Sequence, residues 1–180
     1  MRVLLVHPSP LMYSEIYLRL EPLGLERVAA AVRDAGHDVR LLDLQIFSHK
    51  DYFRELESFA PQAVGFSLNY LANVPEVLDL ARQTRQRWPE CFIFSGGHSG
   101  SFIAAELIEH GAGSLDCVVR GEGELITPRL LEAIGDKQLS TLPGVVTADG
   151  AGPTPLMLDD IDRFAPAREL TRSRHKYFIG

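Results

Sequence analysis

Short apolar runs alternate with segments of helical periodicity along most of this chain, and this alternation constrains the fold more than any other sequence feature. In the first helical segment, for example, Leu25, Val28, Ala29 and Val32 share one helix face. Strands that alternate with helices form βαβ units, whose right-handed crossovers build a parallel sheet covered on both faces. We therefore predict an α/β fold: a flavodoxin-like, doubly wound, mostly parallel five-stranded sheet in the order 2-1-3-4-5. The predicted strands are residues 3–6, 39–42, 63–67, 91–95 and 116–119, and the predicted helices are about 22–35, 50–59, the segment after Asn73, 101–110 and 122–134.

Two of these helices depend on single residues at their starts. Asn73 is predicted to cap the helix that follows it, because an Asn side chain accepts a hydrogen bond from the free N–H groups of a first turn. Pro128 lies within the last predicted helix, and we expect the regular part of that helix to begin there, with Thr127 as its cap.

The pattern changes after residue 142. Residues 1–142 are predicted to form one Rossmann-like domain, and residues 143–156 a small hairpin at the sheet edge. In that hairpin, residues 144–147 form one strand, Asp149-Gly150 the turn, and Thr154-Pro155 the second strand. Residues 157–180 are charged and lack a clear period, so we expect a linker that leads away from the domain.

Composition and charge narrow the classes of protein. The chain is 46% hydrophobic and 23% charged, which is typical of a packed domain and too apolar for disorder. The net charge is −6 and the basic residues are scattered, which argues against a nucleic-acid partner. No signal-peptide pattern or membrane-length apolar run is evident, so a cytoplasmic location is predicted. Cys91 and Cys117 lie in apolar runs and are interpreted as core residues.

The loop after the first strand is unusually long. It runs from His7 to Glu21, about 15 residues, whereas such connections commonly have about two to six. In a parallel sheet the carboxyl ends of all strands meet at one edge, where ligands of such sheets bind. The loop carries many apolar residues, which would be costly to leave in water. We expect it to cover a ligand as a lid or wall, or to pack on the helices of the domain.

Three further loops at this edge carry glycine or small polar residues. They are Ser67-Leu68-Asn69-Tyr70, Gly96-Gly97-His98-Ser99 and Gly121-Glu122-Gly123-Glu124. Glycines let the backbone approach a bulky group, and a helix start offers free N–H donors. Each loop alone can be explained without a ligand, either as a tight turn or by acidic residues that stabilise a helix dipole. His98 by itself is expected to be a solvated loop residue. Their combination at one edge predicts a ligand site.

Several chemistries lack their characteristic residues. Neither G-x-G-x-x-G nor a P-loop follows the first strand, and the acidic cluster of a receiver domain is replaced by His7. No zinc-type Cys/His cluster and no Ser-His-acid spacing occurs in the sequence. We therefore predict no catalytic residues and no metal ligands in this chain.

Taken in order, these motifs resemble the N-terminal cobalamin-binding domain of B12-dependent radical SAM enzymes over about residues 2–170. The chain departs from the family at His98-Ser99, where Pro-His is usual, and it has no Asp-x-His-x-x-Gly, the motif by which mutases supply a histidine to cobalt. The matching segments are residues 3–6 with the Pro-bearing loop, Glu21-Pro22-Leu23-Gly24-Leu25, residues 35–39, residues 64–67, Gly96–Ser99, Arg120–Glu124 and residues 158–168.

The resemblance implies a cobalamin held base-off at the carboxyl edge, with no histidine from that motif on the cobalt. Backbone N–H groups of Gly97 and Gly123, together with Ser67 and Asn69, would bind the nucleotide tail, and apolar side chains would line it. The cofactor-binding residues implied in this way are Ser9, Leu11, Leu23, Ser67, Asn69, Tyr70, Gly96, Gly97, His98, Ser99, Gly121, Glu122 and Gly123.

The resemblance also implies that this chain is a module of a longer protein. A radical SAM domain with a 4Fe–4S cluster and S-adenosylmethionine would follow residues 157–180 and act on a small-molecule substrate, in methyl transfer or a cyclase-type reaction. The module itself is not expected to be catalytic. Two other interpretations stay open from the residues: a flavodoxin-like interaction domain without a cofactor, and a flavin- or nucleotide-binding domain at the same edge.

Overall fold

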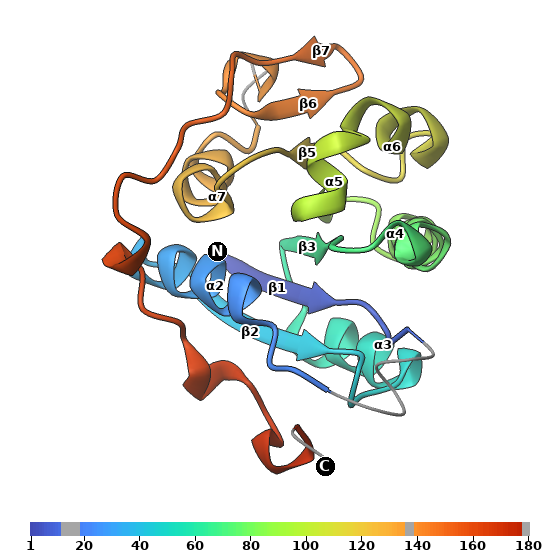
Figure 1. Ribbon diagram of the computed structural model, residues 1–180. Coiled ribbons are helices and arrows are strands. Elements are labelled where there is room, and N and C mark those ends of the chain that lie inside the picture. Colours follow the sequence, from blue (N-terminus) through green and yellow to red (C-terminus); the bar gives the residue numbers. More distant parts are fainter. Residues whose placement is uncertain (12–18, 136–138, 178–180) are drawn as a thin grey trace.

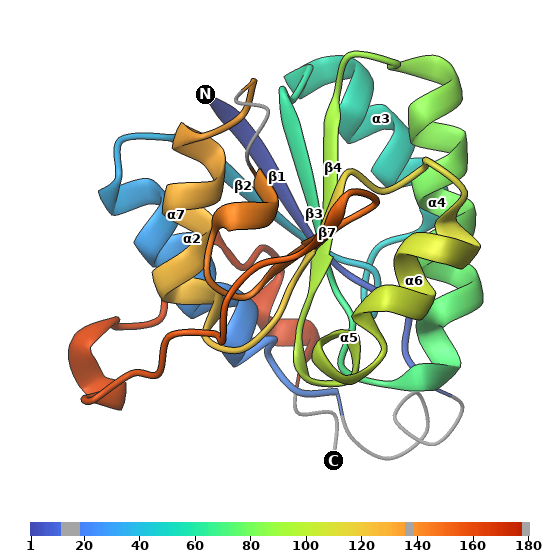
Figure 2. The ribbon, with the colours of Figure 1, turned by 90° about the horizontal axis from the view of Figure 1, so that it is seen from above.

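A seven-stranded sheet in the order β2-β1-β3-β4-β5-β6-β7 forms the centre of the molecule (Figures 1 and 2). The computed structural model describes residues 1–11, 19–135 and 139–177. The first five strands pair in parallel, and β6 and β7 add antiparallel to β5 at one edge. The predicted fold class, five-strand order and edge hairpin are therefore confirmed. The strands are β1 (Arg2–His7), β2 (Asp38–Asp43), β3 (Ala63–Ser67), β4 (Phe92–Gly96), β5 (Cys117–Val119), β6 (Val145–Thr147) and β7 (Gly150–Ala151).

Helices cover both faces of the sheet, as Figure 2 shows from above. Successive residues of a strand point to opposite faces, so Leu4 and Val6 of β1 face one core while Val3 and Leu5 face the other. The first core includes residues of α3, α4 and α6, and the second includes residues of α2 and α7. Their bounds are α2 (Leu23–Asp34), α3 (His49–Phe59), α4 (Val74–Arg87), α6 (Ala104–Gly111) and α7 (Gly123–Glu132), with a short α5 (His98–Phe102) at the carboxyl edge.

Helix starts differ from the sequence-based expectation in three places. The helix predicted at 101–110 begins earlier, at His98, and is divided at Ile103 into α5 and α6. Asn73 occupies the N-cap position of α4, but its side chain makes no capping bond and donates instead to the Ser9 carbonyl at 3.0 Å. Pro128 lies inside α7, which begins five residues earlier at Gly123, so Thr127 is not a cap. Pro128 lacks a backbone N–H, so α7 has one fewer hydrogen bond at this position than a regular helix.

The hairpin is shorter than expected. Its second strand is Gly150–Ala151, directly after the turn, and Thr154-Pro155 lies outside it. Proline has no backbone N–H, so a strand that included Pro155 would lack one hydrogen-bond donor to its neighbouring strand, which is consistent with β7 ending before it.

Residues 166–177, named here the C-terminal strap, pack on the domain. The Ala167 N–H donates to the Glu26 carbonyl at 3.1 Å, and the Thr171 hydroxyl donates to the Glu26 carboxylate at 2.5 Å. Farther along, the Tyr177 hydroxyl donates to Asp43 at 2.6 Å, and both groups are buried. This part of the predicted linker, residues 157–180, therefore packs against α2 and the end of β2.

No helix within residues 1–11, 19–135 and 139–177 is long and apolar enough to cross a membrane.

Candidate ligand site at the carboxyl edge of the sheet

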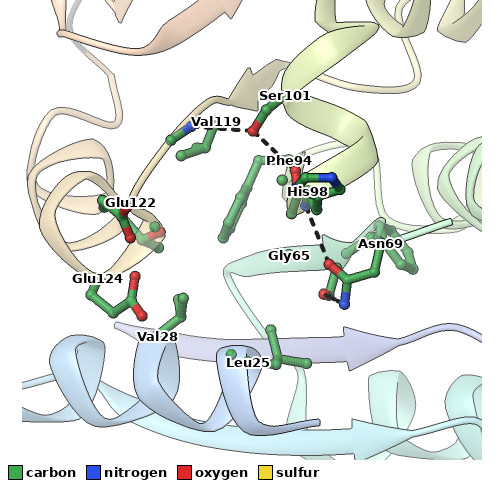
Figure 3. A pocket seen from close by; sticks show the side chains of 18 of the residues that line it. Leu25, Val28, Gly65, Asn69, Phe94, His98, Ser101, Val119, Glu122 and Glu124 are labelled. Atoms are coloured by element: carbon green, nitrogen blue, oxygen red, sulfur yellow. Dashed lines mark hydrogen bonds between the residues drawn. The ribbon is translucent and has the colours of Figure 1, made fainter. Parts of the chain in front are cut away.

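A cavity of about 440 Å³ opens at the carboxyl edge of the sheet (Figure 3). It lies between the sheet, the first turns of α2 and α7, and the loops that follow β3, β4 and β5. Binding pockets for small organic molecules commonly have volumes of about 300–1,000 Å³. The cavity therefore has room for a ligand or for a substantial part of one.

The floor of the cavity comes from one face of four strands. Leu5, Gly65, Phe94 and Val119 belong to β1, β3, β4 and β5 and all line it. A Cβ atom at Gly65 would lie 2.3 Å from Cζ of Phe94 and 2.9 Å from Cδ2 of Leu5. Gly65 thus gives the Phe94 ring room to lie across the sheet, and the result is a flat apolar floor.

Two helices form the walls. Gly24, Leu25 and Val28 of α2 line one side, and Glu124 and Thr127 of α7 line the other. Figure 3 shows Glu122 and Glu124 on the α7 side of the space that Leu25, Val28 and Phe94 border. The walls are apolar on the α2 side and carry carboxyl groups on the α7 side.

Asn69 organises the loops after β3 and β4. Its side-chain N–H donates to the Ser67 hydroxyl at 3.3 Å, and its side-chain carbonyl accepts from the His98 N–H at 3.2 Å. The Ser99 hydroxyl donates to the Asn69 backbone carbonyl at 2.8 Å. Gly97 has φ +97°, and a Cβ there would lie 2.8 Å from Oδ1 of Asn69. The two loops are therefore held together before any ligand binds.

The loop after β5 is held in a similar way. The Gly121 N–H donates to the Ser101 hydroxyl at 3.2 Å, and a Cβ at Gly121 would lie 2.6 Å from Cβ of Pro155. A Cβ at Gly123 would lie 2.9 Å from Cγ2 of Val28. We expected these glycines to admit a ligand, but at Gly97, Gly121 and Gly123 the close neighbours are parts of the chain itself.

The cavity brings together most of the residues that the sequence singled out, while others lie elsewhere. Tyr70 and Leu23 are 58% and 43% exposed and lie outside the lining, as does Leu11. Ser9 is bound to Glu76 through its N–H and its hydroxyl, and Ser99 is bound to Asn69. The lining includes Ser67, Asn69, Gly96, Gly97, His98, Gly121, Glu122 and Gly123.

Sequence reasoning missed several lining residues, and some of them had a detectable signal. An isolated glycine within a strand, such as Gly65, indicates a close approach of another group. Phe102 and Met157 had no such signal, although both line the cavity and are 77% and 72% exposed. The lid predicted from the His7–Glu21 loop falls in part on residues 12–18, which lie outside the described residues.

Glu124 is the buried titratable group in the lining. Its side chain is 9% exposed. Burial raises the pKa of Glu124, the nearby Glu122 raises it further, and its own backbone N–H and Arg27 act in the opposite direction. The carboxyl group therefore keeps its proton to a higher pH than an exposed glutamate does.

A second polar cluster lies at the ends of β1 and β2, outside the cavity lining. Glu76 accepts from the Ser9 hydroxyl at 2.5 Å and contacts Nε2 of His49 at 2.6 Å. The pKa of Glu76 is lowered by these hydrogen bonds although burial acts against them. His7 and Asp43 are close enough to interact, and burial lowers the pKa of His7 and raises that of Asp43. Among the described residues, no group of three or more His, Cys, Asp or Glu side chains is arranged to hold a metal ion.

Comparison with known sequences identifies related proteins. A family described as "B12 binding domain" matches residues 11–131. Hopanoid C-3 methylase of Methylococcus capsulatus is 57% identical over 181 residues, which cover 100% of this chain and 35% of the methylase. Anaerobic magnesium-protoporphyrin IX monomethyl ester cyclase of Synechocystis is 28% identical over 193 residues, which cover 100% of this chain and 38% of the cyclase. The chain thus spans little more than a third of the length of these relatives.

Solved structures show the same fold. The cobalamin-dependent S-adenosylmethionine radical enzyme OxsB, with aqua-cobalamin bound, matches with a TM-score of 0.75 and 19% identity, over 92% of this chain and 24% of that one. The methanol:cobalamin methyltransferase complex MtaBC of Methanosarcina barkeri matches with a TM-score of 0.57 and 13% identity, over 74% of this chain and 45% of that one.

Proposed function

Since this chain belongs to the B12-binding domain family, we propose that the cavity beside α2 and α7 holds the nucleotide tail of a base-off cobalamin. The observation that carries this proposal is a flat apolar floor, made by Leu5, Phe94 and Val119, in a cavity of about 440 Å³ at the carboxyl edge. A flat aromatic base fits such a floor, and the larger corrin ring would lie outside the mouth. The exposed side chains of Phe102 and Met157 are available there to contact the ring.

The residues of this chain would position the cofactor. The Ser67 hydroxyl and the backbone at Gly97 and Gly123 lie in the lining and would hydrogen-bond the polar parts of the tail. Leu23 and Tyr70 are outside the cavity and would contact the ring instead. When bound, cobalamin supplies a cobalt centre for alkyl transfer or a radical step. Family membership favours this function over the cofactor-free and flavin-binding alternatives.

We also propose that the longer protein is a radical SAM methylase that acts on a hopanoid or a related polycyclic lipid. The support is the 57% identity to hopanoid C-3 methylase over the whole of this chain, against 28% to the cyclase. Tyr177 contacts Asp43, the last residue of β2, so the described chain ends at the carboxyl edge. A radical SAM domain with its 4Fe–4S cluster would continue from there and begin near the cofactor.

Retention of a corrin tests the binding proposal. The 180-residue chain is incubated with hydroxocobalamin and desalted, and we expect it to keep a corrin absorbance spectrum at about one equivalent. Gly24→Phe adds a ring at a position that lines the cavity and where a Cβ meets no atom within 4 Å, and should weaken retention. Lys50→Phe, on the exposed side of α3, is the matched control and should retain the corrin. Retention of flavin, or of neither cofactor, by the wild-type chain would contradict the proposal.

The methylase proposal has a separate test. The full-length protein, supplied with S-adenosylmethionine, a reductant and a hopanoid, should form a product in which a methyl group replaces a hydrogen atom, detected by mass spectrometry as a gain of CH2. A chain that retains cobalamin while the full-length protein forms no methylated hopanoid would overturn the substrate proposal alone.

A further inference from the structure

Glu124 is a buried acid whose hydrogen-bonding capacity is mostly unused. It lies in the first turn of α7, lines the cavity and is 9% exposed. Its own backbone N–H donates to the carboxyl group and the charge of Arg27 attracts it, but no side chain of the described residues forms a hydrogen bond with it. Polar groups that lie mostly inside a protein are normally hydrogen-bonded to protein, water or ligand, and the Glu124 carboxyl group lines the cavity. The cavity is where a further partner for Glu124 would lie.

The surroundings of Glu124 restrict what that partner is. Glu122 lines the same side of the cavity, and its carboxylate would disfavour the phosphate of a nucleotide tail beside Glu124. Val28 of α2 lies beside Glu124, Leu25 lies farther along the same helix, and Phe94 borders the cavity across from them. An apolar slot with one acid at its side suits the base of the tail, which is flat, aromatic and largely apolar.

The base also offers the matching chemistry. In base-off cobalamin the ring nitrogen that otherwise binds cobalt is free and can accept a hydrogen bond. We propose that the Glu124 carboxyl group shares a proton with this nitrogen, and so selects corrins whose base carries it. The inference rests on the proposed function, and it adds a specificity-determining residue that also helps to hold the base away from cobalt.

The direction of the pKa shift of Glu124 agrees with this role. Burial and the neighbouring Glu122 raise the pKa of Glu124, while its own backbone N–H and Arg27 of α2 act against them. A carboxyl group that keeps its proton donates it to a ring nitrogen, which is an acceptor.

Two corrins test the proposal. Cobalamin carries the ring nitrogen, whereas p-cresolyl cobamide has a nitrogen-free phenyl ring on the same ribose phosphate. Glu124→Met keeps an unbranched side chain and removes the donor, and Glu124→Gln keeps an N–H donor. Glu132→Met changes an exposed residue at the end of the same helix and is the matched control. Affinities are measured by absorbance titration of the 180-residue chain.

We expect Glu124→Met to bind cobalamin about tenfold more weakly than wild type, the loss of roughly one hydrogen bond. The affinity of Glu124→Met for p-cresolyl cobamide should stay within about twofold of wild type. Glu124→Gln should keep most of the affinity for cobalamin. The control, Glu132→Met, should bind both corrins as wild type does. If Glu124→Met loses equal affinity for both corrins, or loses no affinity for cobalamin, the inference about Glu124 is overturned while the binding proposal stands. If Glu124→Met does not fold, Glu124→Ala is compared in the same way. A wild-type chain that binds neither corrin overturns the binding proposal and this inference together.

Discussion

Replacing Gly65 by alanine adds one methyl group to the middle of β3, directly below the Phe94 ring. The new Cβ would lie 2.3 Å from Cζ and 2.6 Å from Cε2 of Phe94, and 2.9 Å from Cδ2 of Leu5. Non-bonded carbon atoms are most stable at separations of about 3.5–4.0 Å. The ring must therefore move by about 1 Å or more, and the direction open to it is the cavity.

The free energy of unfolding should fall as a result. Adding a methyl group to a packed core costs about 1–3 kcal/mol, and replacing a strand glycine by alanine returns about 0.5–1 kcal/mol of chain entropy. We expect Gly65→Ala to be less stable by about 1–2 kcal/mol. The displaced ring would also occupy part of the proposed base site and weaken cobalamin binding.

Urea unfolding measures the stability difference. Trp88 is the single tryptophan and packs against the core, so its fluorescence reports unfolding. Gly24→Ala adds the same methyl group at a helical position where a Cβ meets no atom within 4 Å, and should be neutral or stabilising by up to about 1 kcal/mol. If Gly65→Ala were as stable as Gly24→Ala and bound cobalamin as wild type does, the assigned roles of Gly65 and Phe94 would be wrong.

Two further predictions concern buried titratable groups. Burial raises the pKa of Glu26 in the folded chain above its ordinary value of about 4.5. The folded chain therefore holds this proton more tightly than the unfolded chain does, and the free energy of unfolding falls as the pH rises above about 4.5. Urea unfolding from pH 4 to pH 8 should therefore show Glu26→Gln gaining stability relative to wild type as the pH rises, and a constant difference would refute this. Burial raises the pKa of Cys91 to about 11 and raises that of Cys117 still further. Mass spectrometry should find neither thiol alkylated by iodoacetamide at pH 8 in the folded chain and both alkylated in urea; rapid labelling of folded Cys117 would contradict its place in the core.

The fold was largely predictable because its main signals are local. Alternating apolar runs and helical periods identified the five parallel strands, and right-handed crossovers limited their order. The errors at Asn73 and Thr127 arise from tertiary contacts. Asn73 has a competing acceptor in the Ser9 carbonyl, and α7 starts at Gly123, five residues before Pro128, at a position where a Cβ would meet Val28 of α2.

The candidate site was predictable in its place but less so in its composition. Loops after β3, β4 and β5 were identified because glycine and small polar residues are visible in the sequence. Phe94 and Leu25 line the cavity but were not identified as site residues. An apolar residue that fits the strand or helix periodicity is predicted to lie in the core, and the pattern is the same whether or not a cavity lies above it. Met157 reaches the lining from beyond the hairpin, and no local pattern predicts such a long-range approach.

The strap has a consequence for how this sheet avoids self-association. β2 is an outer strand, and an outer strand of a parallel sheet presents unpaired N–H and C=O groups that can recruit another chain. Glu169, Leu170 and Arg172 line a pocket together with Val39–Leu41, and Arg172 forms an ion pair with Glu55 at 3.1 Å. Residues after the hairpin thus shield the opposite border of the sheet. A chain shortened at residue 156 would lack the strap, and the outer edge of β2 would then be open to pairing with another chain.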